Sequence, residues 1–302
     1  MALNNMPVTE WAAAIVVRHS ARTYDAGPLD PTILEQLESL VESFLDKETA
    51  RVTVVRNLPE HIFTGTIGHY GRVVGARSGI VIIGNDAQPG MQESAGYLGE
   101  AVILEATSRA IDSCWVDGYF DREATRKLAR LGRNERVLAV SPLGHAQSRP
   151  RAGEKVTKRL VGSHKRRPVE DIAPGFNEET WPAWAVQGVR VARSAPSAMN
   201  RQPWQFVLGN HNSTAGASTG EPAAHAGRTG AVTISMKPKG HDEPVSRRLD
   251  CGIAMLHFEV GARLAGVTGH WKILESPQVA RYRIVAAADA SGRSTGSPQP
   301  RN

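Results

Sequence analysis

The sequence predicts an α+β protein made of two similar halves. Strand-like runs alternate with amphipathic or buried helices along the chain, and two distant stretches resemble each other. The composition, with 41% hydrophobic and 22% charged residues, is that of a globular protein and excludes global disorder. A chain of 302 residues can form two domains or one large domain with a substantial core.

The first half begins with a polar leader and a well-marked helix at 29–45. Asp30 can cap this helix, Pro31 suits its first turn, and apolar side chains recur at helical spacing. The runs RVTVV and SGIVIIG are typical of strands. The remaining elements predicted in this half are a buried helix at 94–111, a turn at 115–120, a helix at 121–132, a strand at 135–144 and a short helix at 153–162.

The second half repeats this mixture of helices and strands. A helix is predicted at 177–194, where Pro182 fits only in the first turn. The stretch at 210–230 is rich in Gly, Ser and Ala and predicts a flexible loop. The other elements predicted here are strands at 202–209, 231–237 and 281–288, a buried helix at 250–266 and a disordered tail at 289–302.

The repeat is carried by GYLGEAVILEATSRAIDSCW and DCGIAMLHFEVGARLAGVTGHW. With a small offset, the matching pairs are Gly99 with Gly252, Glu105 with Glu259, Arg109 with Arg263, and Trp115 with Trp271. Buried helices can share such residues by chance, and that alternative stays open. If the repeat is real, the chain holds two copies of one α+β unit, residues 1–171 and 172–288, packed face to face like a dimer.

Several classes of protein are disfavoured by the sequence. Cys114 and Cys251 are far apart and show no metal-ligand spacing, so a disulfide scaffold or a zinc site is not expected and a reducing compartment is favoured. No apolar run reaches the length of a membrane span, and WAAAIVV near the start lacks the basic leader of a signal peptide. We therefore expect a cytoplasmic protein that does not bind a membrane.

The net charge of +6 is unevenly distributed, because Lys and Arg crowd residues 149–167. Such a run can be a solvated helix face, a phosphate site or a nucleic-acid surface. It lacks the interleaved aromatic residues of a single-strand binder, which disfavours nucleic acid. A second polar cluster is the loop at 193–209, where Ser194, Ser197 and Asn200 precede a strand. Ordinary turn chemistry explains these side chains, and contact with a polar ligand is the other interpretation.

Seven stretches, in order, resemble the nitroreductase superfamily of FMN flavoproteins, and in particular its single-chain, internally duplicated branch. They are VVRHSARTYDAGPL, GYLGEA, SCWVDGYFDRE, VLAVSPLGH, SHKRRPVED, SAPSAMNRQPWQF and DCGIAMLHFE. The resemblance covers nearly the whole chain. It implies a nitroreductase-like fold with antiparallel or mixed sheets flanked by helices, and FMN as the cofactor.

The resemblance also implies a set of flavin-binding residues. The phosphate and ribityl end would be held by Arg18, His19, Ser20 and Arg22, and later by Lys165 and Arg167, with the register inside HKRRP left open. Arg72 would lie near N1 and O2 of the ring. The loop formed by Cys114, Trp115, Val116, Asp117 and Gly118 would run past the ring, although Asp117 stands where many relatives have Gly or Glu. The ring-side loop of the second half would contribute Pro196, Ser197, Ala198 and Asn200.

These two motifs complement each other along the chain. The first half carries R-x-S-x-R but no loop of the SAPSAMN type, and the second half carries that loop but no R-x-S-x-R. In relatives that are true dimers, the two motifs come from different subunits. We therefore expect one complete flavin site in each chain, within a pseudo-dimeric monomer.

Three functions remain open at this point. The first is an FMN oxidoreductase in which NADH or NADPH reduces the flavin and a nitroaromatic or quinone reoxidises it, with no catalytic side chain and no metal required. The second is a flavin-sequestering protein without efficient turnover. The third, nucleic-acid binding through the basic segment, predicts a colourless protein whose binding depends steeply on salt.

Overall fold

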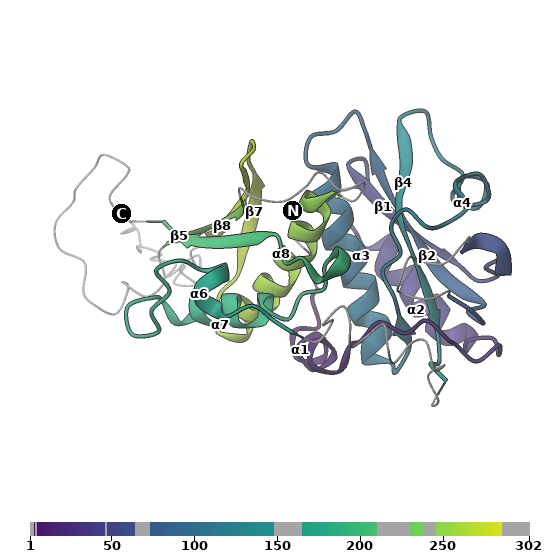
Figure 1. The fold of residues 1–302 in the computed structure, drawn as a ribbon, viewed down its shortest axis with the longest axis horizontal. Coiled ribbons are helices and arrows are strands. Elements are labelled where there is room, and N and C mark those ends of the chain that lie inside the picture. Colours follow the sequence, from purple (N-terminus) through teal and green to yellow (C-terminus); the bar gives the residue numbers. More distant parts are fainter. Residues whose placement is uncertain are drawn as a thin grey trace, which may run out of the picture.

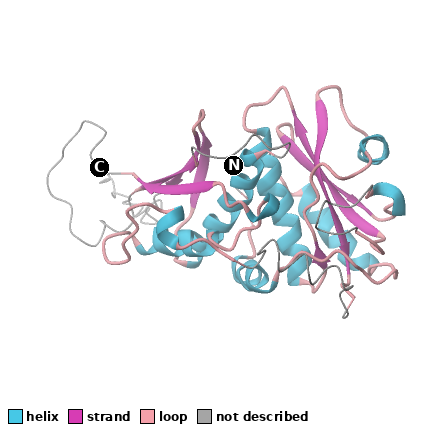
Figure 2. Ribbon diagram, in the orientation of Figure 1, coloured by secondary structure: helices cyan, strands magenta, loops and turns pink. Residues whose placement is uncertain are grey.

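Two β-sheets lie at opposite ends of the molecule, with most of the helices packed between them (Figure 1). The computed structural model describes residues 3, 5–45, 47–63, 73–147, 165–209, 230–237 and 246–285. The layers are seen most directly when the ribbon is coloured by secondary structure (Figure 2). The predicted α+β class is confirmed.

The first sheet has the strand order β1-β2-β4-β3, and every neighbouring pair is antiparallel. Its central strand β2 is buried along nearly its whole length, because its run of Gly, Ile and Val faces helices on one side and a smaller cluster of apolar side chains on the other. A β-bulge interrupts the β2–β4 register between Ile82 and Ile83. The bounds are β1 Ala50–Val55, β2 Ser78–Asn85, β3 Asp112–Ser113 and β4 Glu135–Gly144.

The second sheet repeats this arrangement with the order β5-β6-β8-β7, again antiparallel throughout. It too carries a bulge between its two central strands, between Ile234 and Ser235. The bounds are β5 Trp204–Leu208, β6 Ala231–Met236, β7 Gly269–Ile273 and β8 Gln278–Ile284.

Local sequence signals explain where several helices begin. Asp30 accepts a hydrogen bond from the Thr32 N–H at 2.8 Å, and Asp121 accepts from the Glu123 N–H at 2.9 Å. The helices are α1 Val8–Val17, α2 Pro31–Glu42, α3 Met91–Ser108, α4 Arg122–Ala129, α6 Val169–Ile172, α7 Ala183–Ala192 and α8 Arg247–Leu264, with short 3₁₀ turns η1 Glu60–Ile62 and η3 Ala198–Asn200. The predicted helices that correspond to α2, α3, α4, α7 and α8 are thereby confirmed.

Helix α1 and helix α6 were not predicted. Helix α1 falls in the stretch interpreted as a leader; it has no side-chain cap, and its Trp11 is fully buried with the indole N–H donating to Glu105 of α3 at 2.7 Å. Helix α6 contains the expected boundary between residues 171 and 172. The predicted helix at 153–162, most of the predicted loop at 210–230 and the predicted tail lie outside the described residues.

Helices α3 and α8, of 18 residues each, cross at the centre of the molecule with their backbones in contact. A Cβ placed on Gly96 would lie 2.1 Å from the Leu249 oxygen, and a Cβ placed on Gly252 would lie 2.1 Å from the Glu93 oxygen. Gly96, and not the Gly99 expected from the repeat, is thus the counterpart of Gly252 at this crossing. Gly99 instead gives room to the ring of Trp115.

We expect Gly96→Ala to lower the free energy of unfolding by about 3 kcal/mol or more, because its methyl group would collide with helix backbone that cannot rotate away. Denaturant titration followed by circular dichroism measures the change. Gly27→Ala is the matched control, since a Cβ there meets nothing within 4 Å. Equal stability of the two variants would show that the crossing is not a close contact.

Candidate functional site

The segment after α1 brings two of the predicted site motifs side by side. Ser20 forms a parallel bridge with Ser113, and the Ala21 N–H donates to the Ser113 oxygen at 3.0 Å. The motif at 18–22 therefore runs beside the start of the loop that carries Trp115. Both belong to the first half of the chain.

Arg18 is the most informative residue of this segment. Its side chain is only 6% exposed, and its Nε lies 4.0 Å from Oε1 of the fully buried Glu100 in α3. Its buried Nη1 has no hydrogen-bond partner within the part of the chain that the structure describes. A buried guanidinium nitrogen without an acceptor is costly, so this atom indicates a missing anionic or polar ligand.

Arg166 brings a second guanidinium to Arg18. Burial and the nearby positive charges of Arg18 and Arg193 lower the pKa of Arg166. Its Nη1 donates to Oδ1 of Asn200 at 3.0 Å and its Nη2 donates to the Ser194 oxygen at 3.2 Å. Arg166 thus bonds to the polar loop of the second half and lies near enough to Arg18, in the predicted phosphate motif, for the two charges to interact. The sequence predicted Lys165 and Arg167 with the register inside HKRRP left open, and the structure places Arg166 in the inward-facing position.

The polar loop at 194–202 has an unusual backbone. Met199, Asn200 and Gln202 all have positive φ, at 50°, 54° and 45°, which is uncommon for residues other than glycine. The loop is held by its own bonds, because the Gln202 N–H donates to Oγ of Ser197 at 2.9 Å. The amide nitrogen of Asn200 also donates to the Lys165 oxygen at 2.9 Å. These bonds place Asn200 beside the basic stretch that precedes α6.

Asp250, in the first turn of α8, lies under this loop and is 1% exposed. Its Oδ1 accepts from the Ala198 N–H at 3.0 Å, and its Oδ2 accepts from Nε of Arg201 at 2.6 Å. Burial raises the pKa of Asp250 to about 7, and the negative charge of Asp117 also raises it. Arg201 and the Ala198 N–H lower it, but they do not offset the effect of burial. Asp117, in the loop at 114–118, is therefore close enough for its charge to act on Asp250.

Glu100 connects the loop around Trp115 to the second half. The indole N–H of Trp115 donates to its Oε2 at 2.7 Å, and Nε2 of His257 in α8 lies 2.9 Å from its Oε1. Glu100 and His257 are both fully buried. The carboxylate of Glu100 thus lies near Arg18 and accepts a hydrogen bond from Trp115, both in the first half, and it also bonds to His257 of α8. The positions of residues in the two halves of the chain therefore depend on each other.

The other predicted residues lie around this centre. Nε2 of His19 lies 3.7 Å from Asp112, and the backbone oxygen of Arg22 accepts from the Val74 N–H at 2.9 Å. Lys165 is exposed, and Nη2 of Arg167 donates to the Arg201 oxygen at 3.3 Å. Arg72 lies outside the described residues.

Within the loop at 114–118, Cys114 and Val116 are buried and Gly118 is exposed with a φ of 89°. The Val116 N–H donates to the Val140 oxygen at 2.9 Å, so it is already used in this arrangement. Pro196 and Ser197 are half-buried in the loop of the second half.

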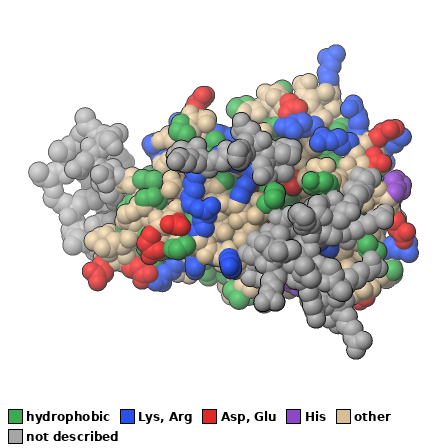
Figure 3. Space-filling view, viewed as in Figure 1, with side chains coloured by type: hydrophobic (Ala, Val, Ile, Leu, Met, Phe, Trp, Pro, Cys, Tyr) green, Lys and Arg blue, Asp and Glu red, His purple; other side chains and the backbone are tan. Residues whose placement is uncertain are grey.

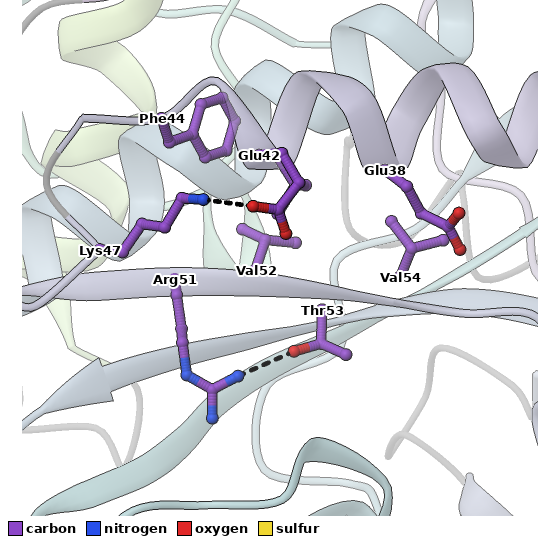
Figure 4. A pocket seen from close by; sticks show the side chains of 9 residues that line it. Glu38, Glu42, Phe44, Lys47, Arg51, Val52, Thr53 and Val54 are labelled. Carbon is purple, nitrogen blue, oxygen red and sulfur yellow. Dashed lines mark hydrogen bonds and ion pairs between the residues drawn. The ribbon is translucent and has the colours of Figure 1, made fainter.

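A separate hollow of about 260 Å³ lies between α2 and β1 (Figure 4), and none of the predicted site residues lines it. Its polar side chains pair with one another or with neighbouring elements: Lys47 with Glu42 at 2.6 Å, and Arg51 with Thr53 at 3.0 Å. Glu38 pairs with Arg56 at 2.6 Å. Because these groups already have partners, the hollow does not resemble a binding site.

Other kinds of site were sought over the described ranges. No cluster of three or more His, Cys, Asp or Glu side chains there could hold a metal ion. None of the helices in those ranges has the length and apolar character that crossing a bilayer requires. On the face drawn in Figure 3, the described Lys and Arg side chains are scattered among Asp and Glu and form no continuous basic stripe.

The family model described as "Putative TM nitroreductase" matches residues 10–262. The chain therefore belongs to this nitroreductase family, and its general class is that of an oxidoreductase. The expected resemblance is confirmed. Comparison with curated proteins found no match.

Two similar solved structures differ in how much of this chain they cover. A "putative nitroreductase" from Thermotoga maritima MSB8 is 20% identical with a TM-score of 0.55, over 91% of this chain and 93% of its own. An FMN-dependent nitroreductase from Clostridium difficile R20291 is 17% identical with a TM-score of 0.37, over 45% of this chain and 88% of its own. The likeness to the Thermotoga protein shows that the two chains share a nitroreductase-like fold.

We expect the stability of the protein to fall as the pH rises from about 4 to about 7, in part because of Asp250. The folded state keeps a proton on Asp250 up to about pH 7, whereas the unfolded chain releases it near 3.8, so the folded state loses relative stability across that window. At about 1.4 kcal/mol per pH unit the loss is at most roughly 4 kcal/mol. Asp250→Asn should remove this component.

Urea denaturation of both proteins between pH 4.5 and 8 measures the difference. Burial also raises the pKa of Glu93 and of Glu259, but these carboxyls are the same in both proteins and cancel. Two stability curves that stay parallel over the whole range would contradict the raised pKa of Asp250.

Proposed function

We propose that this protein is an FMN-dependent oxidoreductase that takes hydride from NADH or NADPH and reduces a small organic acceptor of the nitroaromatic or quinone class. The family membership supports the general class. The single observation that carries the cofactor assignment is Nη1 of Arg18, which is buried without a hydrogen-bond partner among the described residues and belongs to a guanidinium whose charge acts on Arg166. The acceptor class follows from the resemblance of the sequence to nitroreductases.

The chemistry of these donors fits the phosphate of FMN. Burial lowers the pKa of Arg166 most, and the positive charges of Arg18 and Arg193 lower it further, so the guanidinium groups of Arg18 and Arg166 repel each other. A dianionic phosphate would relieve the repulsion and accept a hydrogen bond from Nη1 of Arg18, for which the described part of the chain offers no acceptor. Guanidinium is the side-chain group best suited to bidentate contact with phosphate oxygens.

We also propose that the site is formed jointly by two halves of a duplicated unit. The identical strand orders, the paired bulges, and the matching glycine contacts of α3 and α8 all support a duplication. Under this proposal Arg18, Ser20 and Arg166 come from the first copy, and Asn200 comes from the second. The second, mirror-related site would then be lost.

Bound FMN supplies two-electron chemistry, accepting hydride and passing electrons to the acceptor. The chain's residues would bind and orient it. Arg18 and Arg166 would hold the phosphate, and the loop fixed by the Trp115–Glu100 bond would lie along the ring. The polar loop containing Ser197 and Asn200 would face the ribityl chain with short neutral groups. No side chain is assigned as an acid or a base.

Purified protein should be yellow, or should quench the fluorescence of added FMN, because the phosphate donors and both ring-side loops belong to one chain. Absorbance near 450 nm and a fluorescence titration with FMN measure this. Riboflavin, which lacks the phosphate, is the matched ligand control and should bind much more weakly. A colourless protein that leaves FMN fluorescence unchanged would exclude the proposed cofactor.

Arg18→Ala and Arg166→Ala should each weaken FMN binding by roughly ten- to a hundredfold, because a charge-assisted hydrogen bond contributes about 1.5–3 kcal/mol. Arg136→Ala is the matched control, since Arg136 is 46% exposed and pairs only with Asp86 on the surface among the described ion pairs. Similar losses in all three variants would mean that the arginines act only through the overall charge.

A further inference from the structure

Asp250 is a buried carboxyl group that the proposed flavin chemistry does not use. It lies in the first turn of α8, two residues before the glycine at which α8 crosses α3. That crossing fixes its position relative to both halves of the molecule. A carboxyl group that is 1% exposed is kept in a protein only with partners that satisfy it.

Its partners are the two ends of the strained turn in the polar loop. The Ala198 N–H donates to one carboxylate oxygen at 3.0 Å, and Nε of Arg201 donates to the other at 2.6 Å. Between these two contacts lie Met199 and Asn200, both in the left-handed region. Each such residue costs free energy, and the turn persists only if its surroundings hold it. Asp250 contributes a bond at each end of the turn, in addition to the bonds from Gln202 to Ser197 and from Asn200 to Lys165.

This turn also places the side chain of Asn200 against Arg166. Oδ1 of Asn200 accepts from Nη1 of Arg166 at 3.0 Å, and the charge of Arg18 acts on that same guanidinium. A contiguous set of contacts therefore leads from Asp250 through the turn and Asn200 to Arg166, whose guanidinium also experiences the charge of Arg18. If the turn relaxed, Arg166 would lose the side chain that orients it.

We propose that Asp250 is a positioning residue of the flavin site, whose ionised carboxylate holds the turn at 198–201 in the conformation that orients Arg166. This inference rests on the proposed binding of FMN. Asp250 itself does not touch the cofactor under this proposal; it acts through the turn and through Asn200.

The proposal has a consequence for pH. The groups that face Asp250 are Arg201 on the loop, Asp117 on the loop after β3, and its neighbour Cys251 in α8. Burial and the charge of Asp117 raise the pKa of Asp250 to about 7 in spite of Arg201. The carboxylate is therefore ionised above neutral pH and protonated below it, so the turn is held less firmly on the acid side.

The test is the dissociation constant for FMN, measured by fluorescence quenching between pH 5.5 and 8.5, for the wild type and for Asp250→Asn. For the wild type, the dissociation constant for FMN should be several-fold larger at pH 6 than at pH 8. This ratio should exceed the corresponding ratio for Asp250→Asn. Titration of the FMN phosphate itself affects both proteins alike. Asp250→Asn should bind about tenfold more weakly than the wild type at pH 8.

A melting curve at pH 8 separates positioning from a merely structural role. The variant should melt no lower than the wild type, because it lacks the costly buried charge. Arg201→Gln is a second variant that keeps Asp250 and removes its cationic partner, so the midpoint of the pH dependence should move to higher pH. This variant tests the proposal even if Asp250→Asn fails to fold.

The outcomes are distinguishable. FMN binding that is equally tight in the wild type and Asp250→Asn at every pH, or a midpoint that Arg201→Gln does not raise, would overturn the role of Asp250 and leave the flavin assignment intact. A wild type that binds no FMN at any pH would overturn both proposals.

Discussion

Two glycines bring the backbones of α3 and α8 into direct contact, and the rest of the molecule is arranged around that contact. A side chain at Gly96 or Gly252 would overlap the carbonyl of the opposite helix, so these helices approach as closely as their backbones allow. Each helix also packs against the sheet of its own half. The distance between the two sheets, and the meeting of their loops, therefore follow from a contact that only glycine permits.

The same crossing makes a buried polar network possible. Glu100 and His257 face each other across α3 and α8 with no exposure to solvent, and Trp115 and Arg18 approach the same carboxylate. A carboxylate in such a place needs several donors to offset its desolvation. Its partners come from the end of α1, the loop after β3 and the second half. The apolar packing of the helices and the polar geometry of the site are for this reason parts of one arrangement.

Elements that depend on local signals could be predicted from the sequence, and those that depend on distant contacts could not. Asp30 and Pro31 are local signals that predict the start of α2. Helix α1 instead depends on the hydrogen bond from Trp11 to Glu105, which lies 94 positions away in the sequence. The repeat predicted that α3 and α8 are equivalent helices. It matched Gly99 with Gly252, whereas Gly96 is the glycine of α3 at the crossing, because the rotation of the helix about its axis decides which glycine faces α8 and sequence similarity does not reveal that rotation. For the site, the motif containing Arg18 and the loop containing Asn200 were found by resemblance. The resemblance also placed a basic pair within HKRRP but left its register open, because in a run of consecutive basic residues only the path of the backbone decides that Arg166 turns inward.

The contributions of distant segments to one site also bear on how the protein behaves at low concentration. A site built by two separate subunits is lost when dilution dissociates them. Here Arg18 and Asn200 belong to one covalent chain, and linking two segments gives each an effective concentration of the other on the order of millimolar. The segments around Arg166 belong to one covalent chain, so dilution cannot separate the parts of this candidate site from one another.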